Sequence, residues 1–344
     1  MTCPSKLLFI INPHSGTTDK VALLPLLERY IDGSKFSISS VFTEYEGHAT
    51  ELAHQAANDG YDVVVAVGGD GTVNETARGL IGTSTALGII PCGSGNGLAR
   101  HLLLPLSVKN ALMVINEMEV HDLDYGLIDG HPFFCTCGMG FDAFVSKKFA
   151  EAGKRGPVSY LEQILKEGLH YQPETYEITT ADGTLRYKAF LVSCANASQY
   201  GNNAYIAPQA SMSDGLLDVI VMEPFDLIDA PQISIEMFNK TLDKSSFIRT
   251  FRSDHIQVHR SKEGVIHFDG DPVMAGKDID ISVVHRGIRV VVNRHADKRQ
   301  RKPNVLQTAA SYFFNEINIF RSGLQQQRRH VLAVSKSLQR KLSK

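Results

Sequence analysis

Tyr61-Asp-Val-Val-Val-Ala-Val-Gly-Gly-Asp-Gly-Thr-Val-Asn-Glu75 is the stretch that decides the fold. Residues 61–67 are a continuous apolar run, which is typical of a strand buried on both faces. Gly68-Gly-Asp-Gly-Thr72 interrupts the run, and residues 73–80 have helical spacing. The stretch therefore predicts a buried strand that passes through a glycine-rich turn into a helix, as in an α/β sheet.

The same pattern of strand, loop and helix recurs on both sides of this stretch. An apolar run at 6–12 ends in Asn12-Pro-His-Ser-Gly16, and a short strand at 87–90 leads into Pro91-Cys-Gly-Ser-Gly-Asn-Gly97. About the first 120 residues are therefore expected to form an open α/β sheet. The other expected elements of this part are helices at 21–31, 48–58 and 98–103 and a strand at 36–42.

Beyond Asp124 the segments become short, rich in β-branched residues and bounded by turns. This pattern predicts an antiparallel sandwich or distorted barrel, with helical insertions near 142–170 and 226–246. We therefore expect an α/β domain at 1–125, completed by 285–296, and a β-rich domain at 126–284. The expected strands are 132–137, 176–180, 187–195, 217–222, 254–260, 264–268, 279–284 and 288–292.

Composition places the chain among globular proteins, since 43% of its 344 residues are hydrophobic and 21% are charged. It has no apolar run long enough to span a bilayer and no signal-peptide pattern at its start, so we expect a cytoplasmic protein. The five cysteines are odd in number and lack a regular spacing, which favours reduced core thiols over disulfides.

The charge is distributed unevenly along the chain. Twelve Lys and Arg against two acids give residues 294–344 a charge of +10. Because the net charge of the whole chain is −2, residues 1–293 carry a charge of −12. Apolar residues of the 303–344 segment follow the stripe of an amphipathic helix. Three uses of this tail stay open: packing on the body, binding to an anionic membrane surface, or self-association as a homodimer.

The glycine-rich loops suit the binding of phosphate. Glycines let the backbone approach a ligand closely and adopt positive φ, and free N–H groups at a helix start attract an anion. Asp70 is suited to hold Mg²⁺, which prefers a few carboxylates together with water and phosphate oxygens. The Gly-Lys-Ser/Thr of the P-loop is missing, and so is the dinucleotide fingerprint after the first strand.

Six motifs, in order, resemble those of the diacylglycerol kinase catalytic-domain family, which includes sphingosine kinases. The resemblance covers residues 6–293 and implies an open Rossmann-like α/β domain followed by a mainly antiparallel β-sandwich. It also implies ATP and Mg²⁺ as cofactors. The motifs are Asn12–Gly16, Gly68–Glu75, Pro91–Arg100, Gly138–Ala143, Ser213–Asp218 and Phe268–Asp271.

The resemblance also implies roles for individual residues. A Mg²⁺ ligand set would comprise the Asp214 carboxylate and backbone carbonyls at Ser211 and Leu216, although Asp214-Gly215 alone reads as a hairpin turn. The positions implied to contact ATP are Asn12, Pro13, His14, Ser15, Gly16, Thr43, Gly68, Gly69, Asp70, Gly71, Thr72, Val73, Asn74, Gly93 and Ser94.

The proton acceptor of the family lies in a segment that reads Asp269-Gly-Asp271 here, with Asp in place of the usual Glu. Asp271 is therefore the first candidate for the base and Asp269 the alternative, because a base must reach the hydroxyl that it deprotonates. Asp142, in Gly-Phe-Asp-Ala, is a candidate for orienting substrate, or else a helix cap. Asp70 completes the set of candidate catalytic acids.

We therefore expect an ATP-dependent lipid kinase whose acceptor, diacylglycerol or a sphingoid base, stays open. Its expected partners are the lipid substrate and a membrane surface bound peripherally, and no nucleic acid. An NAD kinase-like phosphotransferase shares the Gly-Gly-Asp-Gly-Thr loop and is the nearest alternative. A non-catalytic regulator that binds nucleotide or lipid is the other, since a fold alone does not fix function.

Overall fold

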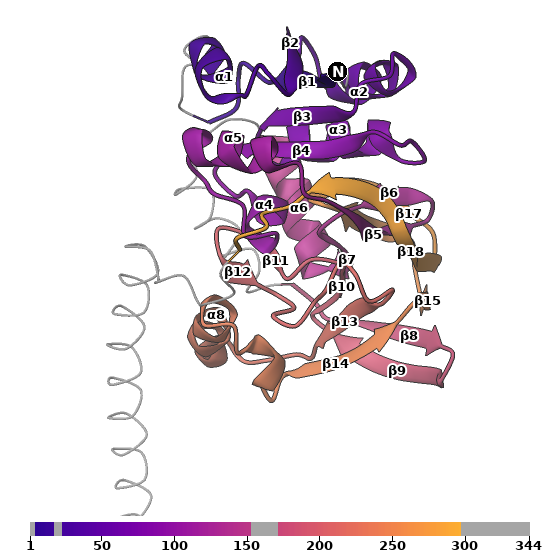
Figure 1. Cartoon of the computed structure of the whole chain (residues 1–344). Helices are drawn as coiled ribbons and strands as arrows, with labels where there is room; N and C mark the ends of the chain where they lie inside the picture. Colours follow the sequence, from indigo (N-terminus) through magenta and orange to yellow (C-terminus); the bar gives the residue numbers. More distant parts are fainter. Residues whose placement is uncertain (1–3, 17–22, 153–170, 297–344) are drawn as a thin grey trace, which may run out of the picture.

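The amino-terminal strands form a parallel sheet in the computed structural model, which describes residues 4–16, 23–152 and 171–296 (Figure 1). They run in the order β2-β1-β3-β4, and every residue of β3 and β4 is buried. The chain leaves β1 and β3 toward opposite sides, so their carboxyl ends form a switch point, where open α/β sheets bind ligands. The strands are β1 (Ser5–Ile11), β2 (Phe36–Phe42), β3 (Val63–Gly68) and β4 (Ala86–Pro91).

Five helices belong to this part of the chain. The helix α2 packs against α3, and α1 packs against α5. Gly79 permits the first of these contacts, because a Cβ there would collide with the carbonyl oxygen of Thr50 on the neighbouring helix. The helices are α1 (Leu24–Tyr30), α2 (His48–Asn58), α3 (Asp70–Leu80), α4 (Gly97–His101) and α5 (Val108–Glu117).

A single long strand, β18 (Asp278–Val291), joins the two parts of the molecule. Near its end Val290 lies beside Leu87 of β4 in a parallel pairing, while the rest of β18 pairs antiparallel with two other strands. The main sheet therefore has ten strands and changes from parallel to antiparallel at β18. Its antiparallel members, besides β18, are β5 (Val120–Ile128), β6 (His131–Phe133), β8 (Glu174–Thr180), β9 (Gly183–Ala189) and β15 (His255–Arg260).

A second, six-stranded antiparallel sheet packs on this antiparallel half, with the order β14-β13-β10-β7-β16-β17. A shared apolar core, which includes Ile256 and Ile281 of one sheet and Val192 and Val219 of the other, fills the space between them. The predicted architecture of an α/β domain followed by an antiparallel sandwich is confirmed. The strands are β7 (Thr136–Gly140), β10 (Leu191–Ala195), β13 (Leu217–Met222), β14 (Ile248–Ser253), β16 (Gly264–Phe268) and β17 (Asp271–Ala275).

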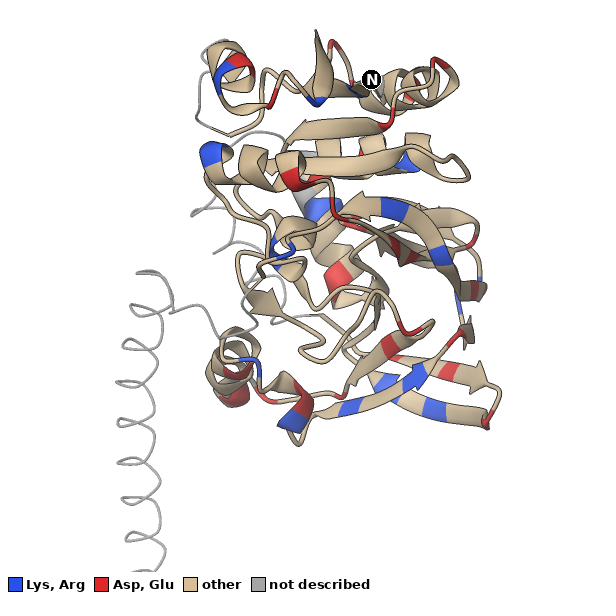
Figure 2. Cartoon of the chain, viewed as in Figure 1, with Lys and Arg blue, Asp and Glu red and all other residues tan. Residues whose placement is uncertain are grey.

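The remaining elements lie beside the second sheet. The ribbon of β11 and β12 contacts α4, and α6 covers β7 and β16. Basic residues recur along the edge strands β9 and β14 (Figure 2), which discourages further strand pairing. These elements are β11 (Gln199–Gly201), β12 (Ala204–Tyr205), α6 (Phe141–Ala152), α8 (Ala230–Phe238) and the 3₁₀ turns η2 (Leu227–Asp229) and η3 (Leu242–Lys244).

Several predicted segments differ from the structure in their bounds. The predicted strand 187–195 is two strands, because Phe190 bonds instead to Met222 and Phe141. The predicted strands 279–284 and 288–292 are one strand, β18, with a register shift between them. The sequence reading missed β5, β11, β12, β14, β17 and α5. The expected tail helix at 303–344, the later part of the 142–170 insertion and the start of the 21–31 helix lie outside the described residues.

Four of the five cysteines lie in the described part of the chain, and all four are free thiols, as predicted. Cys137 and Cys194 face each other across β7 and β10, and burial raises the pKa of the Cys137 thiol. Within residues 4–16, 23–152 and 171–296, no helix combines the length and the apolar character needed to cross a bilayer.

His101, at the end of α4, connects the α/β part to the segment after β10. Its Nδ1 accepts the backbone N–H of Ser198 at 3.0 Å, which places the ring proton on Nε2. Burial lowers the pKa of His101 to about 4, because the charged imidazolium would lose its solvation. The neutral form of His101 is therefore the one that holds this connection.

We expect this connection to weaken in acid. Since the folded pKa lies below the ordinary 6.5, His101 contributes stability above pH 6.5 that is lost as the pH falls toward 4. Relative to His101→Gln, the native protein should lose up to about 3 kcal/mol of unfolding free energy over this window. Urea unfolding at several pH values measures the loss, and parallel pH profiles of the two proteins would contradict it.

Candidate active site

Three loops meet at the switch point of the parallel sheet. Asn12, after β1, donates from its side-chain amide to Thr72 Oγ1, at the start of α3, at 3.0 Å. Gly16 packs so closely on Cys92 that a Cβ would collide with the Cys92 carbonyl oxygen. A Cβ on Gly93 would lie 2.5 Å from Gly69 Cα. The loops after β1, β3 and β4 are therefore in direct contact.

Close approach explains these glycines better than backbone conformation does. Among them Gly16 has a positive φ of 61°, whereas Gly68, Gly69, Gly71 and Gly93 do not. In the third loop the left-handed position is taken by Asn96, with φ 52°. The expectation of positive φ in the Gly68–Gly71 loop is therefore wrong. Close packing accounts for Gly68 and Gly69, where a Cβ would lie 2.5 Å from Thr72 and 3.3 Å from Gly93 Cα, whereas a Cβ on Gly71 would meet open space.

Asp70 connects the second and third loops. Its Oδ2 accepts the N–H of Asn96 at 2.8 Å, and its Oδ1 accepts the N–H of Gly97 at 2.6 Å. Gly95 must be small here, because a Cβ would lie 2.7 Å from Asp70 Oδ2. A carboxylate has about four lone-pair sites, so Asp70 keeps acceptor capacity beyond these two bonds.

The remaining candidate positions for nucleotide contact lie around this junction. The 12–16 loop is a tight turn in which Ser15 bonds to Asn12 O and His14 N–H bonds to Asn12 Oδ1. Thr43, just after β2, donates its N–H to Ile11 O at 2.9 Å. Val73 and Asn74 are buried in the first turns of α3, and Ser94 is exposed. Pro13 lies within the 12–16 turn after β1.

Asp269 and Asp271 have different environments. The Asp269 carboxylate accepts three backbone N–H groups, from Phe134 and Cys135 at 2.7 Å and from Thr136 at 3.0 Å. Burial raises the pKa of Asp269 to about 6, against the lowering effect of these donors. Asp269 therefore anchors the β16–β17 hairpin to the segment before β7.

Asp271 is more exposed and faces the α/β part. Its Oδ2 lies 2.9 Å from Nη2 of Arg78, which comes from α3. The Arg78 guanidinium also lies 5.1 Å from the centre of the Phe268 ring, and Phe268 stacks on His131. The ion pair thus ties the end of the β16–β17 hairpin to the helix that begins at Asp70.

Asp142, in the first turn of α6, is almost buried. Its Oδ1 accepts the N–H of Ala143 at 2.8 Å. Its Oδ2 lies 3.1 Å from His267 Nε2 and 3.4 Å from the Tyr200 hydroxyl. The side chain therefore points into the second sheet rather than to solvent.

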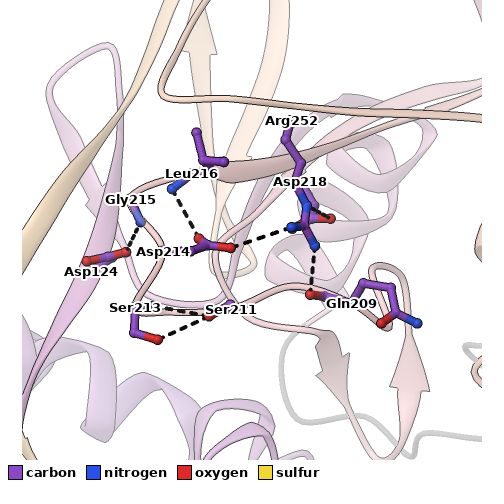
Figure 3. A network of polar contacts seen from close by, with 9 residues as sticks. All are labelled: Asp124, Gln209, Ser211, Ser213, Asp214, Gly215, Leu216, Asp218 and Arg252. Carbon is purple, nitrogen blue, oxygen red and sulfur yellow. Dashed lines mark hydrogen bonds and ion pairs between the residues drawn. The ribbon is translucent and has the colours of Figure 1, made fainter.

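The 211–216 turn is held by a buried acid (Figure 3). Asp124, on β5, is fully buried and accepts the N–H groups of Gly215 and Arg286, each at 2.7 Å. Its Oδ1 also lies 2.8 Å from His285 Nδ1. Ser211 and Ser213 hydroxyls bond to each other within the turn.

Arg252 lies against the same turn. Its guanidinium lies 3.6 Å from Asp214 Oδ2, 3.1 Å from Asp218 Oδ1 and 3.0 Å from the Gln209 carbonyl (Figure 3). Asp214 is one-third exposed, and its Oδ1 accepts the Leu216 N–H at 3.2 Å. A hard cation at Asp214 would therefore have to share this carboxylate with Arg252. The described residues contain no cluster of three or more His, Cys, Asp or Glu side chains placed for a metal.

Sequence reasoning missed the residues that act across the tertiary structure. Arg78, Tyr200, His267 and Arg252 carry no motif of their own, and each becomes notable only through a partner far away in the sequence. For Asp124 the signal was an acid directly before the apolar Tyr125-Gly-Leu-Ile128, where an unpaired buried charge would be costly.

Comparisons with known proteins match both parts of this fold. The family model of the diacylglycerol kinase catalytic domain matches residues 6–128, and that of the YegS C-terminal NAD kinase beta sandwich-like domain matches residues 135–278. A probable lipid kinase YegS-like from Chromohalobacter salexigens is 29% identical, over 66% of this chain and 75% of that protein. A diacylglycerol kinase of Bacillus subtilis is 27% identical, over 82% of this chain and 95% of that protein.

The fold is also similar to that of a solved structure. A crystal structure of a diacylglycerol kinase from Bacillus anthracis superposes with a TM-score of 0.69 at 21% sequence identity. The match covers 86% of this chain and 100% of the other. At this identity the superposition shows a shared two-part fold, and the chemistry must be argued from the residues.

We expect Asp70→Asn to lower the free energy of unfolding by about 1–3 kcal/mol, because the Asn96 and Gly97 N–H groups bond to different oxygens of Asp70, and in Asn one of these oxygens is replaced by an NH2 donor. Asp62→Asn is the matched control, since Asp62 accepts one backbone N–H, from Lys6, before β3 begins. Chemical denaturation should show the smaller loss for the control. An Asp70→Asn protein as stable as the native one would rule out this role of the carboxylate.

Proposed function

The chain belongs to the diacylglycerol kinase catalytic-domain family, and from this premise we propose that it transfers the γ-phosphoryl group of ATP to a hydroxyl of a lipid. The observation that carries the proposal is the meeting of two glycine-rich loops and the Asn12–Gly16 loop at the switch point, with an acidic hairpin docked beside them through Arg78. A phosphate donor would bind at the loops, and an alcohol acceptor would bind at the acidic hairpin.

The loops would bind the phosphates through backbone N–H groups. α3 begins at Asp70, and no side chain caps its first turn, so its N–H groups and dipole favour an anion. Asp70 sets the spacing of the loops through its bonds to Asn96 and Gly97. Alignment and charge neutralisation dominate phosphoryl transfer, so a rigid cradle is the main contribution that this part of the chain makes.

Mg²⁺, when bound with ATP, would neutralise the charge of the phosphates. Asp70 offers a carboxylate at the loops, and Asp214 with the carbonyls of Ser211 and Leu216 would hold a further ion in the second part. For this further ion, the chain would keep the 211–216 turn in place through the hydrogen bond from the Gly215 N–H to Asp124.

Asp271 is the better candidate for the proton acceptor. Asp269 has both oxygens occupied by backbone donors and cannot turn toward an alcohol without breaking them. Asp271 is exposed and has one partner, Arg78, on the nucleotide side. Its exposed carboxylate is free of backbone donors, so it could accept the proton of an acceptor hydroxyl that binds beside it.

We expect Asp271→Asn to lower kcat by about 10²- to 10⁴-fold, while Asp271→Glu, which restores the length of the usual base, keeps most activity. Asp278→Asn is the control, because Asp278 is an exposed acid that pairs with His259 at the start of β18, the next strand along the chain and a member of the other sheet. Radioactive phosphate transfer measures all three. Full turnover by Asp271→Asn would remove Asp271 from the mechanism and return the role to Asp269.

The acceptor class is tested by offering diacylglycerol, a sphingoid base and NAD side by side with labelled ATP. Label in either lipid supports the proposal. Label in NAD alone would support a nucleotide kinase, and no label in any acceptor, from a protein that binds ATP, would support a regulator.

We also propose that the basic tail brings the enzyme to its lipid. Residues 294–344 carry a charge of +10, and each basic residue near an anionic surface contributes about 1 kcal/mol of attraction. Deleting residues 303–344 should therefore weaken binding to vesicles of phosphatidylserine and phosphatidylcholine at low salt. Unchanged sedimentation with the vesicles would assign the tail to packing or to self-association as a homodimer.

A further inference from the structure

The strand β2 is the outermost member of the parallel sheet (Figure 1). Its inner edge pairs with β1 along its whole length, from Phe36 opposite Ser5 to Phe42 opposite Ile11. No other strand in the described parts of the chain pairs with its outer edge. Such an edge presents a row of N–H and C=O groups that can pair with a further strand, so proteins commonly place charged residues or proline there.

The other edge strands of the ten-stranded and six-stranded sheets carry this protection. In contrast, β2 reads Phe-Ser-Ile-Ser-Ser-Val-Phe and contains no charged residue and no proline. Among the edges of these two sheets, as far as the structure describes them, β2 is therefore the one that is open to pairing. The protecting residues are Arg186 and Lys188 on β9, Arg249 and Arg252 on β14, Pro132 on β6, and Asp271 and Pro272 on β17.

The hydrogen bonds to β1 show which backbone groups of β2 face outward. Thr43, one residue beyond the strand, donates its N–H to the Ile11 carbonyl oxygen of β1 at 2.9 Å. Along a strand, successive residues point their N–H and C=O groups to opposite edges. The odd-numbered residues of β2 therefore bond to β1, and the backbone groups of Ile38, Ser40 and Phe42 face the open edge.

A second copy of β2 fits this edge in an antiparallel register centred on Ser40. Ser40 then lies opposite Ser40 of the second copy, and Ile38 lies opposite Phe42. All three positions have outward-facing backbone groups, so each pair exchanges both of its N–H···O bonds. Ile38 and Phe42 are half-buried, and an aromatic side chain opposite a β-branched one stabilises an antiparallel pair.

The charges beyond the ends of β2 favour the same direction of pairing. Lys35 precedes the strand, Glu44 and Glu46 follow it, and all three are exposed. Antiparallel pairing brings Lys35 of one copy near Glu44 of the other, whereas parallel pairing would bring like charges together. A two-fold axis through Ser40 also makes the contact isologous, which is the commonest arrangement in homodimers.

We propose that β2 is the contact surface for a second copy of this chain, so that two parallel sheets join into one continuous sheet. This contact uses the body of the protein rather than the basic tail, and it does not depend on the kinase function proposed above. A single strand edge buries less surface than a standard interface, so we expect a Kd on the order of micromolar.

The substitution Ser40→Lys tests the contact at its centre. Ser40 is exposed, so the change should leave the fold intact, but it places two ammonium groups directly opposite each other at the axis. In sedimentation velocity the native full chain should form a species of twice 37.9 kDa, and Ser40→Lys should raise the Kd of this dimer by roughly tenfold or more. Ser37→Lys is the matched control, because it adds the same charge at an exposed position of β2 that faces Thr43 rather than its own copy.

A charge swap separates this contact from a general effect of charge. An equimolar mixture of Ser40→Lys and Ser40→Glu should recover the dimer that neither variant forms well alone, because opposite charges then meet at the axis. A native protein that stays monomeric at about 100 µM would overturn the proposal. A dimer that Ser40→Lys leaves intact would also overturn it, including one that is lost only when residues 303–344 are deleted.

Discussion

Asp70 accepts the backbone N–H groups of Asn96 and Gly97, and these two bonds hold the loop after β3 against the loop after β4. The contact is possible because glycines stand wherever a side chain would collide, as at Gly93 and Gly95. The parallel sheet supplies the rigid base, since β3 and β4 are buried throughout. The phosphate-binding geometry that we propose depends on this junction of the two loops. The antiparallel part of the molecule, which carries the proposed base Asp271, is positioned relative to it.

Two connections set that position. β18 runs from the antiparallel sandwich into the parallel sheet beside β4, so both parts share one hydrogen-bonded sheet. The ion pair between Arg78 and Asp271 then ties the hairpin of the candidate base to the helix that starts at Asp70. The hydrogen bonds of the shared sheet persist as long as the protein is folded, whereas an ion pair at a partly exposed site contributes little stability. Asp271 is thus held near α3 without being locked there.

Local sequence predicted β1 to β4, the helix of residues 48–58 and the three loops after β1, β3 and β4, because buried strands and glycine turns are encoded by neighbouring residues. It could not rank Asp269 above or below Asp271, since the difference lies in three N–H groups from residues 134–136. It also gave no signal for His267, whose meaning comes from Asp142 on another element. Burial and contacts with residues far away in the sequence decide such roles, and the local sequence pattern indicates neither.

The central claim is that the three loops bind ATP, and isothermal titration calorimetry with Mg·ATP tests it most directly. The native protein should bind, and Gly93→Ala should bind much more weakly, because its new Cβ would press on Gly69 and open the cradle. Heat of binding that is absent from the folded native protein would contradict the account, as would equal affinity in the two proteins.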